Sequence, residues 1–142
     1  MPIEAFSDDW AAQFKDQINS SAAYRESARG WRWTVGLVVE AEPDRSFQVG
    51  RGVVLDLYEG EARAVQVTDV EAAQDCAFVI SAPYSRWKQV AQKELDPTRG
   101  MLQGKLRLKG NLPTIVRYNK AARELTECTS RIDVAWPDDP LQ

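Results

Sequence analysis

The segment that most constrains the fold is a stretch of alternating residues at 102–109, which leads directly into the start of a helix. Alternate side chains of a β-strand point to opposite faces of its sheet. One face of this segment carries leucines: Leu102, Leu106 and Leu108. The other face carries cations: Lys105, Arg107 and Lys109. The pattern therefore predicts a half-buried strand with a basic outer face.

The residues after this strand predict the last helix of the chain. Gly110 ends the strand, Asn111 is a favourable N-cap, and Pro113 fits the first helical turn. We expect the helix to span about 112–130. Its inward-facing candidates recur at helical spacing: Ile115, Tyr118, Ala122, Leu125 and Cys128.

The N-terminal third predicts two helices followed by a strand. Ser7 can cap a helix over 8–19, in which Trp10, Phe14 and Ile18 form one apolar stripe. A shorter helix follows over 24–29. From Trp31 the period changes to two, with one face expected to be covered, made of Trp31, Trp33, Val35, Leu37 and Val39.

The middle of the chain predicts three more strands and a helix. A turn at 42–45 precedes a strand over 47–58, and a second turn at 59–61 leads to a strand that contains Val65 and Val67. A short strand over 76–81 precedes a helix that begins near Pro83 and ends before Pro97. We expect residues 133–142 to form a loose tail. This order of elements indicates an α+β, two-layer fold.

Composition narrows the functional classes. At 142 residues we expect a single domain over 1–142, and the net charge of −3 argues against a nucleic-acid partner. Because no apolar run reaches eighteen residues, we expect a cytoplasmic protein. The chain has no histidine, which removes the commonest general base and most transition-metal sites. We therefore expect no metal, no cofactor and no enzymatic activity. Cys76 and Cys128 have no metal-type spacing and are expected to be reduced thiols.

Several residues, taken in order, resemble the sterol carrier protein family (type two). The matching positions are Trp10, Asn19, Tyr24, Asp56, Trp87, Asp96-Pro97, Gly104-Lys105-Leu106 and Lys109-Gly110-Asn111. The resemblance covers about 5–130, and its front half looks like the bacterial stand-alone branch. It implies a five-stranded mixed sheet with helices on one face, enclosing an apolar tunnel for a sterol, a fatty acyl chain or another lipid. The chain ends in Pro140-Leu141-Gln142 rather than a peroxisomal Ser-Lys-Leu type address.

The resemblance predicts non-catalytic binding or transfer of a hydrophobic small molecule. The predicted ligand-binding residues are Trp87, Val90, Ile115, Tyr118, Leu106, Phe78, Leu37 and Val35. The same side chains could instead form an ordinary packed core. Lys105, Arg107 and Lys109 could contact an anionic membrane surface or simply keep a strand face solvated. Two further functions stay open, namely an accessory protein–protein or oligomerisation module without a lipid ligand, and an enzyme that works through carboxylates.

Overall fold

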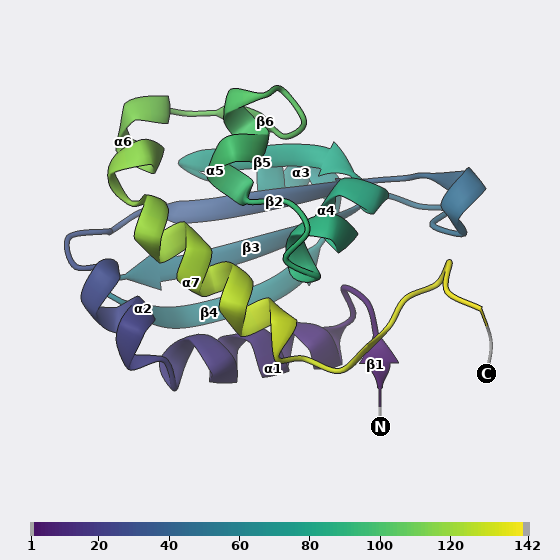
Figure 1. Cartoon of the computed structure of the whole chain (residues 1–142), viewed down its shortest axis with the longest axis horizontal. Helices are drawn as coiled ribbons and strands as arrows, with labels where there is room; N and C mark the ends of the chain where they lie inside the picture. The colour runs from purple at the N-terminus through teal and green to yellow at the C-terminus, as the bar shows by residue number, and fades with distance from the viewer. Residues whose placement is uncertain (1, 141–142) are drawn as a thin grey trace.

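The computed structural model describes residues 2–140, and its centre is a five-stranded mixed sheet (Figure 1). The strands lie in the order β4-β3-β2-β5-β6, with β2 and β5 parallel and the other neighbours antiparallel. Their bounds are β2 Thr34–Glu40, β3 Arg51–Tyr58, β4 Glu61–Thr68, β5 Phe78–Pro83 and β6 Arg107–Lys109. Two very short strands, β1 Ile3–Glu4 and β7 Val134–Ala135, pair separately in parallel. The predicted α+β fold with a five-stranded mixed sheet is confirmed.

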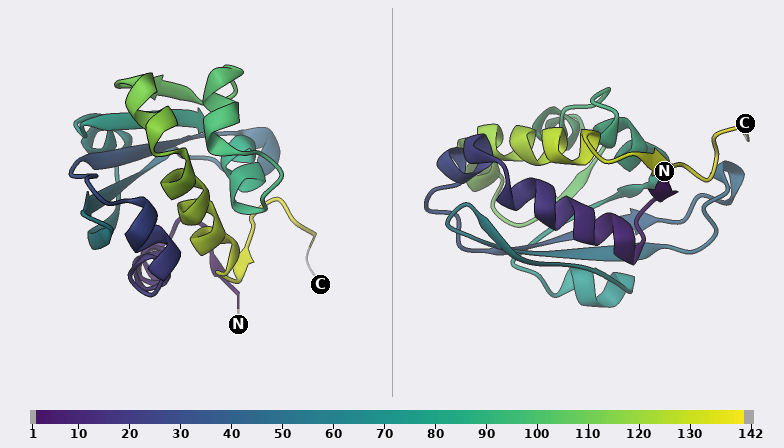
Figure 2. Two further views of the ribbon diagram at one scale, coloured as in Figure 1. Left: turned by 60° about the vertical axis from the view of Figure 1, so that its left-hand side comes forward. Right: turned by 90° about the horizontal axis from the view of Figure 1, so that it is seen from below.

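Helices cover one face of this sheet, as the view from below shows (Figure 2, right). Those on the covered face are α1 Asp8–Asn19, α2 Ala22–Ser27, α4 Tyr84–Ala91, α5 Pro97–Leu102, α6 Leu112–Arg117 and α7 Asn119–Ser130. The predicted caps form: Ser7 and Asn111 each accept a hydrogen bond from a backbone N–H three residues later. A single-turn 3₁₀ helix, Pro43–Arg45, lies between β2 and β3.

The opposite face of the sheet carries one short helix that the sequence analysis did not predict. This helix, α3 (Val70–Gln74), packs against β2 and β3 and forms a small second core of Val38, Ala73 and Val79. Both faces of β2 are therefore buried. Close packing is possible because Gly36 has no side chain: a Cβ there would lie 1.9 Å from the carbonyl oxygen of Ala73.

Replacing Gly36 by alanine is expected to lower the free energy of unfolding by about 2 kcal/mol, because α3 must move away from β2. Gly104→Ala is the matched control. Its Cβ would meet no atom within 4 Å, and only the positive φ of +75° opposes it, a strain of about 1 kcal/mol. Urea unfolding measures both variants. Equal stability of Gly36→Ala and wild type would contradict close packing of α3.

Between α4 and α7 the structure differs from the strand that was predicted over residues 102–109. Residues 97–102 form α5, with Asp96 as its N-cap and Pro97 at its first position, so β6 is only three residues long. As a consequence Leu102 does not face the core and is 62% exposed, whereas Leu106 is buried. The predicted last helix is also divided at Tyr118 into α6 and α7. Trp33 precedes β2 and is 39% exposed, so it does not continue the buried face that Trp31 was expected to share with it.

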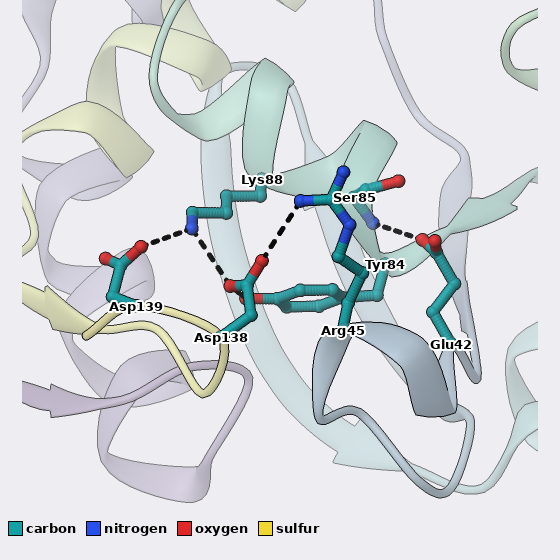
Figure 3. A network of polar contacts seen from close by, with 7 residues as sticks. All are labelled: Glu42, Arg45, Tyr84, Ser85, Lys88, Asp138 and Asp139. Carbon is teal, nitrogen blue, oxygen red and sulfur yellow. Dashed lines mark hydrogen bonds and ion pairs between the residues drawn. The ribbon is translucent and has the colours of Figure 1, made fainter. Parts of the chain in front are cut away.

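The C-terminal tail is held in place rather than loose over 133–140. Asp138 accepts a hydrogen bond from the Tyr84 hydroxyl at 2.6 Å and from Lys88 Nζ at 2.9 Å (Figure 3). Arg45 lies 3.5 Å from the same carboxylate, and Lys88 also pairs with Asp139 at 2.6 Å. We call Asp138, its three partners and Asp139 the tail clasp. Residues 141–142 lie outside the described part of the chain.

Aromatic packing reinforces the tail clasp. The ring of Trp136 lies 5.9 Å from the ring of Phe6 and 6.2 Å from that of Tyr84. Glu42, beside Arg45, accepts a hydrogen bond from the backbone N–H of Ser85 and so stabilises the start of α4 (Figure 3). The sequence pattern could not predict the tail clasp, because Asp138 lies at least fifty residues after Tyr84, Lys88 and Arg45 in the chain.

Candidate functional site: an apolar cavity between sheet and helices

An apolar cavity lies between the sheet and the layer of helices and has a volume of about 120 Å³. Strands β2, β3 and β5 form its floor through Val35, Leu37, Leu55, Leu57 and Ile80. The N-terminal elements contribute Phe6, Trp10, Phe14, Tyr24 and Trp31. The later helices contribute Trp87, Val90, Ala91, Pro97, Met101, Ile115, Tyr118, Ala121, Ala122, Leu125, Thr126 and Thr129.

The lining is suited to a hydrocarbon and offers no acid or base. None of the lining residues is charged, and the polar ones are two tyrosines and two threonines. Burial, aided by the nearby Cys128, raises the pKa of Tyr24, which therefore stays neutral. The indole N–H of Trp87 donates to the backbone carbonyl of Val38 at 2.9 Å. That hydrogen bond satisfies the only polar atom of the Trp87 side chain.

Six of the eight predicted ligand-binding residues line this cavity. They are Trp87, Val90, Ile115, Tyr118, Leu37 and Val35. The other two are buried but do not line it. Phe78 packs against Trp31, at 5.0 Å between ring centroids, while Leu106 packs against Gly100 of α5. The structure thus brings residues from β2, α4, α6 and the α6–α7 junction to one space.

Several lining residues were not among those predicted to bind ligand. Trp10 and Phe14 were predicted as a buried stripe of α1, and both are buried and reach the cavity. Met101 reaches it from α5, a helix that the sequence analysis did not predict. The signal for α5 was present: an aspartate followed by proline at the first helical position is a common start of a helix.

The remaining candidates lie outside the cavity. Lys105, Arg107 and Lys109 are exposed, and Arg107 pairs with Glu40. Asp56 forms an ion pair with Arg63 at 3.0 Å, in keeping with a solvent-facing carboxylate. Burial raises the pKa of both Cys76 and Cys128, which keeps them as thiols.

Over residues 2–140 no three metal-ligating side chains come together in a way that could hold an ion. Within that same part of the chain, each helix is too short or too polar to cross a bilayer.

Comparisons with known proteins agree with this architecture. The model of the SCP-2 sterol transfer family matches residues 11–123. A crystal structure of sterol carrier protein 2 is 33% identical, with a TM-score of 0.84 over 91% of this chain and 99% of that one. The solution structure of a conserved hypothetical protein from Thermus thermophilus, described as possibly a sterol carrier protein, is 32% identical, with a TM-score of 0.83 over 94% and 92% of the two chains.

More distant structures share the fold alone, such as apo sterol carrier protein 2 of Yarrowia lipolytica, at 15% identity and a TM-score of 0.55 over 84% of this chain and 88% of that one. No functionally curated protein gave a significant match. The family model spans most of the chain, and two solved structures match nearly all of it at about one third identity. This chain belongs to the SCP-2 sterol transfer family.

Proposed function

We propose that this protein binds a lipid, with the hydrocarbon part of the ligand in the apolar cavity, and that it carries or presents the lipid without chemically changing it. The observation that carries this proposal is the uncharged cavity between sheet and helices. Family membership supports it, as does the similarity to a protein described as sterol carrier protein 2. The proposed ligand is a fatty acyl chain, a sterol or a lipid of similar polarity.

The physical driving force is burial of hydrocarbon. Each methylene that leaves water contributes about 0.8 kcal/mol, so a chain of a dozen methylenes gains about 10 kcal/mol before costs. Association and ordering of the chain remove part of this gain, and micromolar binding remains within reach. An apolar cavity of this kind tends to stay free of water, so little hydration opposes entry of the ligand.

The cavity must widen to take a whole lipid. Its 120 Å³ is smaller than the several hundred cubic ångströms typical of sites for drug-sized ligands. The strand floor is held by β-sheet hydrogen bonds, whereas α5 and α6 have six residues each and are joined to the rest by turns. We infer that widening takes place on the side of α5, α6 and the start of α7.

The direct test is identification of lipid that co-purifies with the protein, by native mass spectrometry, followed by competition with a fluorescent fatty acid. The proposal expects saturable binding of the probe and displacement by at least one lipid class. Absence of binding by fatty acids, sterols and their esters alike would contradict it. That result would favour the accessory or oligomerisation module as the function of this fold.

Trp87 offers a local probe of ligand entry. Because its ring lines the cavity, we expect its fluorescence to change when an acyl chain binds. Trp10 and Trp31 also line the cavity, so the signal of Trp87 is obtained by subtracting a Trp87→Phe variant from wild type. Trp33 is the internal control, since it does not line the cavity. A fluorescence change that comes from Trp33 alone would show that the ligand binds outside the cavity.

A further inference from the structure

We propose that residues 97–120, here called the basic segment, dock on an anionic lipid bilayer and form the face through which the cavity exchanges lipid with that bilayer. The segment comprises α5, β6, α6 and the first two residues of α7. In Figure 1 these elements lie along the upper side of the view, around the edge strand β6.

The first argument is the uneven distribution of charge. The basic segment contains six cations and no carboxylate side chain: Arg99, Lys105, Arg107, Lys109, Arg117 and Lys120. The rest of the chain then carries twelve cations and all twenty-one carboxylates, a net charge of −9. An acidic protein thus concentrates positive charge in one short stretch, which complements an anionic surface.

The second argument is that most of these cations are available. Arg107 pairs with Glu40, and just outside the segment Arg123 pairs with Asp96 at 3.5 Å. The other five cations are exposed, and within residues 2–140 none of them has a carboxylate oxygen within 4 Å: Arg99, Lys105, Lys109, Arg117 and Lys120. They can therefore interact with an outside partner without first breaking an ion pair.

The third argument favours a bilayer over another polyanion. Leu102 on α5 is 62% exposed and Val116 on α6 is 45% exposed, within a few residues of the cations. Exposed aliphatic side chains beside lysine and arginine suit the boundary between head groups and acyl chains. A nucleic-acid backbone would use the cations but offers nothing to these two side chains.

The fourth argument connects this surface with the cavity, and it rests on the proposed function. The basic segment also forms part of the cavity wall, through Pro97, Met101, Ile115 and Tyr118. Met101 and Leu102 are neighbours, as are Ile115 and Val116, and in each pair one side chain lines the cavity while the other is exposed. A lipid that leaves between α5 and α6 would enter the bilayer directly and avoid exposure of its hydrocarbon to water.

The test uses vesicles of phosphatidylcholine and phosphatidylglycerol in equal parts, with pure phosphatidylcholine vesicles for comparison. The variant Lys105→Gln, Lys109→Gln, Arg117→Gln removes three unpaired cations from the basic segment. Each cation near an anionic surface contributes about fivefold to partitioning, so the variant should bind about a hundredfold more weakly at low salt. Leu102→Gln should weaken binding to the same vesicles by about tenfold.

The matched control, Lys15→Gln, Arg29→Gln, Arg131→Gln, makes the same change in net charge at other positions. It should retain most of the wild-type partitioning. Equal weakening by the two triple variants would show that only net charge matters and would overturn the proposal. Unchanged partitioning of the basic-segment variant would overturn it as well. The proposal would also be overturned if the basic-segment variant lost binding to a DNA oligonucleotide but still bound the vesicles.

Binding of a fluorescent fatty acid without vesicles separates this inference from the proposed function. The basic-segment variant should bind the free fatty acid with wild-type affinity, while its transfer of fatty acid from anionic vesicles slows. If wild type binds neither fatty acids nor sterols nor their esters, the proposed function fails, yet vesicle partitioning still tests the docking surface. If wild type binds the fatty acid and the basic-segment variant transfers it from anionic vesicles as fast as wild type does, the basic segment is not the face for lipid exchange.

Discussion

Replacement of Ala122 by phenylalanine is expected to weaken lipid binding strongly while leaving the protein folded. Ala122 faces the cavity from α7 at a half-buried position. The new ring would fill space that about four methylenes of a ligand could use, a loss of about 3 kcal/mol or about a hundredfold in Kd. Filling of a cavity usually maintains or raises stability, so the thermal midpoint should not fall.

The matched control for this experiment is Ala23→Phe, which places the same side chain on an exposed position of α2. It should bind the fluorescent fatty acid as wild type does. If Ala122→Phe proves unstable, Leu125→Phe makes a smaller change on the same cavity wall and should still weaken binding. Wild-type affinity in a folded Ala122→Phe variant would show that the ligand does not occupy the cavity.

Removal of the Asp138 side chain is expected to lower the free energy of unfolding by about 3 kcal/mol, because it leaves buried polar partners without their acceptor. The carboxylate is 9% exposed and accepts hydrogen bonds from Tyr84 and Lys88. Asp139→Ala is the control next to it in the sequence. Asp139 pairs with the same Lys88 but is half exposed, so its loss should change stability by less than about 1 kcal/mol. Equal effects of the two substitutions, in urea unfolding, would show that the tail clasp adds no stability.

The tail clasp also predicts how stability depends on pH in acid. Burial alone raises the pKa of Asp138, but the hydrogen bonds from Tyr84 and Lys88 outweigh it and hold the pKa below its ordinary value. A lowered pKa in the folded state contributes stability above the ordinary value of about 4 and loses it as the pH falls through the folded-state pKa. Asp138→Ala should therefore lose less stability than wild type on acidification.

At alkaline pH the dependence is opposite, and the stability that the tail clasp contributes falls as the pH rises. Burial, followed by the hydrogen bond to Asp138, raises the pKa of Tyr84. A raised pKa contributes stability below the ordinary tyrosine value of about 10 and loses it as the pH rises beyond that. The tail clasp is thus most effective between about pH 4 and pH 10.

Local signals predicted those parts of the structure that depend on neighbouring residues. Ser7 and Asn111 cap the expected helices because an N-cap needs only the backbone N–H groups of the next turn. Alternation predicted the inward face of β2, and helical spacing predicted that Ile115, Tyr118, Ala122 and Leu125 would point inward. The family resemblance led to the prediction of eight ligand-binding residues, and six of these eight line one cavity.

The order of the strands, the second buried face and the tail clasp depended on tertiary structure, because each joins residues far apart in the chain. Val38 is buried only because α3, more than thirty residues later, packs over it. Leu102 has the same side chain as Leu106 but is exposed, since α5 rotates it away from the core. A periodic pattern records which side chains can share a face, whereas the packing of distant elements decides which faces are covered.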